Sequence, residues 1–182
     1  AMDAAHRQGI IHRDLKPDNV LVARGPSGAP SPKIVDFGIA RILEGTTYTV
    51  SGALLGTCRY MSPEQVQGDK ATDHRSDIYS LGVVLYELLA GAVPFDSKTL
   101  REAAYAHIQR IIREVDPPIP STRISRNSDT IVAVAAKRQM EPRRLGTAIR
   151  GELDWIVMKA MEKDRQRRYE TANGLAADIR RY

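Results

Sequence analysis

The sequence is poor in cysteine. Its 182 residues contain only one, Cys58. A single thiol excludes an internal disulfide framework and a metal site built from several cysteines, and it fits a reducing compartment. We interpret Cys58 as a structural residue rather than a reactive one.

Long apolar runs are also missing. The longest, LGVVLYELLAG at 81–91, contains Glu87 and is too short to span a bilayer. No signal peptide is visible at the start of the chain. We therefore expect a cytoplasmic segment without membrane contact. A membrane anchor, if the protein has one, is expected in parts of a longer protein outside these residues.

Aromatic residues make up only 5% of the chain. Tyr60, Trp155 and Tyr169 are far apart and lie in helical or motif contexts, so we expect them to pack in the core rather than stack on bases. The 27 basic and 22 acidic residues give a net charge of +5. This excess permits acidic partners such as nucleotides, but solvated basic surfaces account for it, and we expect no nucleic acid partner.

The first half of the chain combines a short hairpin with one long helical pattern. Residues 1–8 are typical of the end of a helix that starts outside the chain, with Gly9 as its cap. NVLVA at 19–23 and PKIVDF at 32–37 predict a β-hairpin. Residues 39–62 predict a long loop. SDIYSLGVVLYELLA at 76–90 predicts a central helix that is buried on all sides and closed by Gly91.

The second half predicts a surface helix, a basic excursion and two final helices. Thr99 and Glu102 form a capping box for an amphipathic helix at 99–115. Residues 117–150 hold seven Lys or Arg against two acids and several prolines. We expect a largely irregular, solvated insertion with TIVAVAAKRQ as its one helical candidate, and a docking patch is the alternative. Residues 153–161 and the segment after Thr171 predict helices, the latter with these residues inward: Ala172, Leu175, Ala176 and Ile179.

One stretch points to a site. IIHRDLKPDNVLV at 10–22 sets His12, Asp14, Lys16 and Asn19 between apolar runs. A core strand does not tolerate so many charges, because unpaired buried ions cost several kcal/mol, and a plain surface loop does not need apolar flanks. We therefore interpret this stretch as a functional site.

The order of the motifs resembles the protein kinase family. His12-Arg13-Asp14, then Lys16 and Asn19, a hairpin, and DFG at 36–38 resemble the catalytic loop and metal-binding turn of kinases. GTCRYMSPE at 56–64, SDIYSLG at 76–82 and DRQRRY at 164–169 resemble later segments of the family, with Ser62 in place of the usual Ala. The resemblance covers essentially the whole chain and is closest to bacterial serine/threonine kinases. It implies an α+β, mainly helical fold, the large C-terminal lobe of a kinase with a hairpin at the catalytic loop.

The resemblance implies roles in transferring the γ-phosphate of ATP, with Mg²⁺, to Ser or Thr hydroxyls of protein substrates. Asp14 is expected to orient and deprotonate the acceptor, and Lys16 to stabilise the transferring phosphate. Asn19 and Asp36 are expected to hold Mg²⁺, since they offer the hard oxygen ligands that it prefers. Leu21 is either part of the apolar floor under adenine or an ordinary strand-core residue.

Other residues take structural and regulatory roles by the same resemblance. His12 is expected to shape the loop, and Asp77 to accept hydrogen bonds from the backbone of that loop. Glu64 and Arg168 are expected to form a buried ion pair. By the same resemblance, Thr57 is implied in binding the peptide substrate. Regulatory roles are implied for Arg13, Thr49 and Ser51, with a phosphate on Thr49 or Ser51 as the partner of the Arg13 cation.

The chain departs from a complete kinase domain in one respect. A Gly-rich loop, a strand Lys and a helix Glu precede the catalytic loop in the family, and the eleven residues before His12 cannot contain them. We therefore expect residues 1–182 to be a partial domain, the large lobe alone, and to be inactive in isolation. The alternative is a non-catalytic scaffold module of kinase fold, which the intact set of Asp14, Lys16, Asn19 and Asp36 disfavours.

Overall fold

A computed structural model of the chain describes residues 1–37, 58–95 and 105–182. Most of the expected loop at 39–62 and the start of the helix expected at 99–115 lie outside these residues. In chain order the elements are α1 (Met2–His6), η1 (Pro17–Asn19), β1 (Val20–Arg24), β2 (Pro30–Ile34), α3 (Pro63–Val66), α4 (Arg75–Ala90), α6 (Tyr105–Glu114), α7 (Pro120–Ser125), α8 (Ser128–Lys137), α9 (Pro142–Ile149), α10 (Glu152–Ala160) and α11 (Ala172–Arg181).

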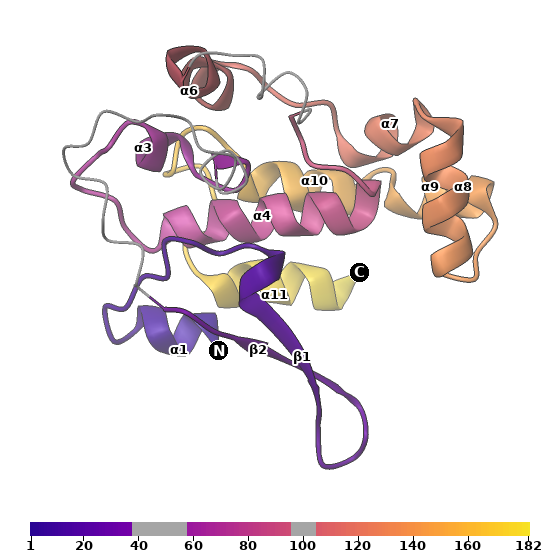
Figure 1. Ribbon diagram of the computed structural model, residues 1–182, viewed down its shortest axis with the longest axis horizontal. Coiled ribbons are helices and arrows are strands. Elements are labelled where there is room, and N and C mark those ends of the chain that lie inside the picture. Colours follow the sequence, from indigo (N-terminus) through magenta and orange to yellow (C-terminus); the bar gives the residue numbers. More distant parts are fainter. Residues whose placement is uncertain (38–57, 96–104) are drawn as a thin grey trace.

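Helix α4 forms the centre of the molecule, between α10 and α11 (Figure 1). Ten of its sixteen residues are buried, and a Cβ atom on Gly82 would lie 2.9 Å from the Cβ of Ala160, so α4 and α10 approach too closely for any larger residue there. The helix ends as expected at Gly91, whose φ is +69°. The expectation of burial on all sides is wrong at Leu88, which is 62% exposed.

The predicted hairpin is present and extends away from the helices (Figure 1). Strands β1 and β2 pair antiparallel, with Val20 opposite Ile34. The side chain of Leu21 is 55% exposed, so the interpretation of this residue as strand core is wrong. Because the pair stands as a two-stranded ribbon, no neighbouring strand of the described chain covers its side chains.

The expectation of a largely irregular stretch at 117–150 is wrong, because it folds as α7, α8 and α9. Pro120 and Pro142 stand at the first positions of α7 and α9, where proline has no backbone hydrogen bond to lose and favours the helix. Asn127 caps α8 by accepting from the backbone of residues 129 and 130. Three residues bury the stretch in the main core, and each is at most 2% exposed: Ile124, Leu145 and Ile149.

Helix α6 rests on a smaller core of its own. Ile108, Ile111 and Ile112 pack against Cys58 and Val66 at α3. Burial raises the pKa of the Cys58 thiol, which keeps it protonated and fits the structural role expected of it.

The two predicted C-terminal helices are present as α10 and α11. Ala172 and Leu175 are buried as expected, whereas Ile179 is exposed. Tyr169 lies in the core, but the expectation for Trp155 is wrong, since this side chain is 55% exposed. It lies on the outer side of α10, where Lys159 Nζ is 4.7 Å from the centre of its ring. No helix within the described ranges is long and apolar enough to cross a membrane.

Candidate active site

The loop at 12–19 is anchored from beneath by Asp77, a fully buried residue in the first turn of α4. The backbone N–H of His12 donates to its Oδ2 and that of Arg13 to its Oδ1, both at 2.8 Å. The predicted contact between Asp77 and this backbone is therefore present. His6 Nε2 also lies 2.8 Å from Oδ2, a third partner that nothing in the sequence singles out.

His12 joins the loop to the end of β2. Its buried ring lies 2.8 Å from the carbonyl oxygen of Val35 through Nε2, and the Phe37 ring is 4.8 Å away between centroids. The backbone N–H of Asp14 donates to Nδ1. With both ring nitrogens occupied by backbone groups, His12 holds the loop in shape, as expected from the sequence.

Three of the expected catalytic residues converge. Lys16 Nζ lies 2.9 Å from Asp14 Oδ2, and the two side chains are 19% and 20% exposed. Asn19 Nδ2 donates to the Asp14 carbonyl oxygen at 2.7 Å and to Asp14 Oδ2 at 3.2 Å. The carboxylate is thus oriented by a cation and an amide while it stays partly open to solvent.

The chain brings Asp36 back to this group. The backbone N–H of Val35 donates to the carbonyl oxygen of Asn19 at 3.0 Å. Asp36 is the next residue in the chain after Val35. Its side chain is exposed, and its φ of +60° is in the left-handed region. Arg13 has a φ of +68°. Such conformations cost about 1 to 3 kcal/mol and concentrate at functional sites.

The donor atoms fit a magnesium ion held jointly with a substrate. Because Nδ2 of Asn19 donates to Asp14, its Oδ1 is the atom left for a cation, and no described residue bonds the carboxylate of Asp36. Within the described ranges no group of three or more His, Cys, Asp or Glu side chains could hold a metal alone. Mg²⁺ typically takes one or two protein oxygens together with phosphate oxygens and water.

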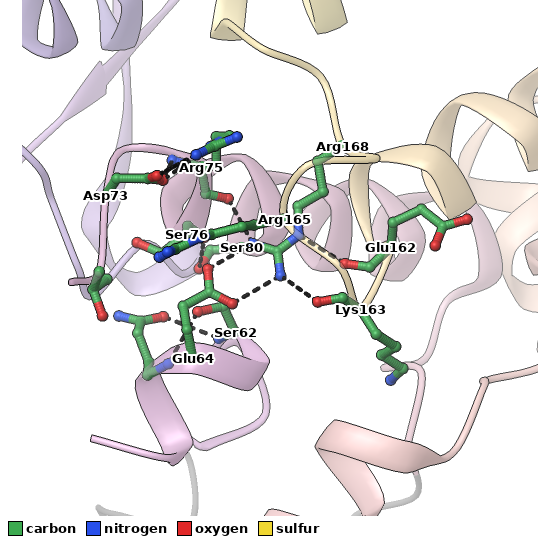
Figure 2. Close-up of polar contacts among 12 residues, drawn as sticks. Ser62, Glu64, Asp73, Arg75, Ser76, Ser80, Glu162, Lys163, Arg165 and Arg168 are labelled. Atoms are coloured by element: carbon green, nitrogen blue, oxygen red, sulfur yellow. Dashed lines mark hydrogen bonds and ion pairs between the residues drawn. The ribbon is translucent and has the colours of Figure 1, made fainter. Parts of the chain in front are cut away.

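The expected buried ion pair is present (Figure 2). Arg168 binds Glu64 through two contacts, of 2.6 Å to Oε1 and 2.8 Å to Oε2. The remaining donors of Arg168 reach backbone carbonyl oxygens of Arg75, Glu162 and Lys163. The pair joins residues 104 positions apart and connects α3, α4 and the segment before α11.

Helix α3 is tied to the loop by a contact that sequence reasoning missed. Ser62 accepts from the backbone of Gln65, and the Gln65 side chain accepts from the backbone N–H of Ser62, the reciprocal bonds of a capping box. Gln65 Nε2 also donates to the Arg13 carbonyl oxygen at 2.6 Å. The sequence SPEQ at 62–65 is typical of a capping box, but it does not predict the contact with Arg13.

Four further expected residues remain. Leu21 lies on the exposed hairpin, and Thr49, Ser51 and Thr57 lie outside the described residues.

The sequence matches the family model described as protein kinase domain over residues 1–178. It is 38% identical over 180 residues to the serine/threonine-protein kinase PknB of Mycobacterium leprae, covering 98% of this chain and 24% of that protein. It is 37% identical over 179 residues to a probable serine/threonine-protein kinase of Clostridium perfringens, covering 98% and 22%. The chain thus spans about a quarter of the length of these relatives.

A solved structure has the same fold. The crystal structure of the Mycobacterium tuberculosis PknI kinase domain is similar with a TM-score of 0.56 at 23% identity, over 99% of this chain and 50% of that one. The mainly helical body with one two-stranded hairpin corresponds to the large C-terminal lobe of a kinase, as the sequence predicts. The match to the family model and the identity to bacterial serine/threonine kinases place this chain in the protein kinase family.

Proposed function

We propose that this chain carries the catalytic loop of an enzyme that transfers the γ-phosphate of ATP to Ser or Thr hydroxyls of proteins. The observation that supports this most is the convergence of Asp14, Lys16 and Asn19 within 3.2 Å on a loop anchored by a buried carboxylate. Phosphoryl transfer depends on positioning and charge neutralisation rather than on covalent chemistry, and this group supplies both. Since ATP is the donor, the reaction belongs in the cytoplasm.

Asp14 acts on the acceptor. Its partly exposed carboxylate takes the proton of the substrate hydroxyl as that oxygen bonds to the γ-phosphorus and the bond to ADP breaks. Lys16, 2.9 Å from Asp14 Oδ2, balances the charge of the transferring phosphoryl group. Asn19 holds the Asp14 carboxylate in one orientation through its amide nitrogen.

Asn19 and Asp36 are the residues that hold Mg²⁺. The ion, when bound with ATP, supplies positive charge that neutralises the phosphates. Leu21 offers an exposed apolar side chain from β1 as one face of the adenine site, and Thr57 contributes to binding of the peptide acceptor.

Arg13 is the proposed sensor of phosphorylation. Its Nε is buried and has no hydrogen-bond partner in the described part of the chain, and the same holds for Nε of Arg59. A phosphate on Thr49 or Ser51 would offer these guanidinium groups oxygens and about two negative charges. We expect a double variant, Thr49→Ala with Ser51→Ala, to lose activity in the full-length protein; full activity would refute the regulatory role.

The isolated chain is expected to bind ATP poorly. Among the described residues the proposal assigns only the exposed Leu21 to the adenine ring, and positioning supplies most of the catalysis. Calorimetry of residues 1–182 with Mg²⁺-ATP tests this, and micromolar binding with turnover would contradict it.

The proposed reaction is tested in the full-length protein with labelled ATP and a generic basic protein. Labelled phosphoserine or phosphothreonine should form, and chelation of Mg²⁺ should abolish it. Asp36→Ala should weaken Mg²⁺-dependent nucleotide binding, whereas Asp18→Ala, which removes an exposed carboxylate from the loop at 12–19, should not. Folded protein that binds no nucleotide and transfers no phosphate would instead support a non-catalytic scaffold of kinase fold.

A further inference from the structure

The positive charge of this chain is concentrated at one end. Residues 117–150 hold seven Lys or Arg and two acids, a net charge of +5, which equals that of the whole chain. The other 148 residues carry 20 basic and 20 acidic side chains. The structure places this charge on α7, α8 and α9, at the opposite end of α4 from α3 (Figure 1).

Most of these cations are exposed to solvent. Six of the seven basic residues are exposed, and Arg123 is partly buried. None forms an ion pair with an acid of the described ranges. Ordinary solvated charges come in mixed signs, and an unbalanced group of one sign attracts a partner of the opposite sign. The basic residues are Arg123, Arg126, Lys137, Arg138, Arg143, Arg144 and Arg150.

The same end also exposes apolar side chains. Val132 on α8 is 56% exposed and Met140, just beyond it, is 40% exposed. Arg138 of the same segment donates to the backbone carbonyl oxygen of Leu88, a residue of α4 whose side chain is also exposed. Of the ten residues of α8 only Ala135 is buried, so this helix presents apolar surface to solvent next to basic groups.

Helices α7, α8 and α9, which carry these exposed residues, are firmly packed onto the rest of the fold. Helices α8 and α9 pack against each other, and Ile124, Leu145 and Ile149 fix the region in the main core. Asp154 at the start of α10 accepts from the backbone and the hydroxyl of Ser121, which ties α7 down. A surface whose backbone is already fixed loses little conformational entropy when a partner binds.

We propose that the exposed residues of α8 and α9 form a docking surface for an acidic amphipathic segment of a partner protein. The cations would pair with its carboxylates, while Val132 and Met140 would contact its apolar side chains. A second copy of this chain is disfavoured, because residues 117–150 of the two copies, each with a net charge of +5, repel one another. Asp129 in the first turn of α8 and Glu141 at the N-cap of α9 are exposed. They would repel the phosphates of lipids or nucleic acid, whereas a protein segment can place a Lys or Arg there.

The test uses the full-length protein and a labelled peptide of about eighteen residues with Glu on one helical face and Leu on the other. Its binding is followed by fluorescence anisotropy at about 0.1 M ionic strength. Arg143→Glu with Arg144→Glu should weaken binding about tenfold or more. Val132→Ser with Met140→Ser should weaken it by a similar factor. All four side chains are exposed, and circular dichroism checks that the variants stay folded.

The matched control reverses two exposed charges elsewhere, Arg24→Glu with Lys70→Glu, and should leave binding unchanged. Two results would overturn the proposal. One is equal binding of a scrambled peptide with the same composition, which would mean that charge alone acts. The other is tighter binding of phosphatidylserine vesicles or of single-stranded RNA that is lost in the same variants.

Discussion

The Arg168–Glu64 pair and the Lys16–Asp14 pair join similar groups in opposite surroundings. The side chains of the first are 0% and 8% exposed and those of the second 19% and 20%. Arg168 also donates to three backbone carbonyl oxygens, whereas Asp14 keeps a partly open carboxylate. The first pair completes a closed network that holds distant segments together, and the second leaves room for a substrate.

The same contrast extends to how the pairs are connected. Glu64 and Arg168 are 104 residues apart, so their contact closes the fold, while Asp14 and Lys16 are neighbours on one loop. Asp77 connects the two regions, since it lies in the first turn of α4 and binds the backbone of His12 and Arg13. The buried network thus holds the loop in position, and the proposed chemistry is assigned to the open pair.

The largest expected effect comes from breaking the buried pair. Arg168→Ala leaves the Glu64 carboxylate buried without its cation, so the free energy of unfolding should fall by about 3 to 5 kcal/mol. Urea unfolding of the full-length protein measures it. Arg110→Ala is the matched control, because it removes the exposed pair with Glu114, and should cost at most about 0.5 kcal/mol. Equal effects of the two changes would contradict the contrast.

A smaller effect is expected where the two regions connect. Asp77→Ala leaves the backbone N–H groups of His12 and Arg13 without an acceptor, and should reduce the free energy of unfolding by about 2 to 3 kcal/mol. Phosphate transfer should fall as well, because the loop loses its anchor. Asp77→Asn keeps one acceptor oxygen and should restore part of both. A stable, active Asp77→Ala variant would show that the loop is positioned by other contacts.

The smallest expected effect concerns a cation beside the buried network. Burial lowers the pKa of Lys163 from 10.5 to about 8, and its Nζ donates to the Ile112 carbonyl oxygen. Above about pH 8 the folded protein has released this proton while the unfolded chain still binds it, so stability attributable to Lys163 rises with pH between 8 and 10.5. Lys163→Met removes that rise. Urea unfolding measures the free energy of unfolding of the wild type and of Lys163→Met between pH 8 and 10.5. The difference between the two free energies should change with pH, and a constant difference would contradict the lowered pKa.

Much of the fold could be predicted from local patterns. The short apolar runs of the hairpin and the long apolar run of α4 are patterns of neighbouring residues in the sequence, and both predicted elements are present. The contacts of Asp77 and the Glu64–Arg168 pair also follow the prediction, because the motifs that contain them have a characteristic order along the chain.

The features that were not predicted from the sequence depend on tertiary contacts. Several prolines in 117–150 favour an irregular segment, but a proline at the first position starts a helix, as Pro120 and Pro142 do. Only the packing of Leu145 and Ile149 distinguishes the two outcomes. Trp155 is exposed because its helix turns Ile156 and Val157 inward instead. The bonds from His6 to Asp77 and from Gln65 to Arg13 join segments far apart in the sequence, so no local sequence pattern predicts them.

Phosphate transfer by Asp14→Asn in the full-length protein tests the account most directly. The substitution keeps the size of the side chain and removes the proton acceptor, so the rate should fall by roughly 10²- to 10⁴-fold. The melting temperature should stay close to that of the wild type, since the carboxylate is partly exposed. Asp18→Asn, on the same loop and exposed, should retain full activity. Near wild-type transfer by Asp14→Asn, or equal losses in both variants, would contradict the central claim.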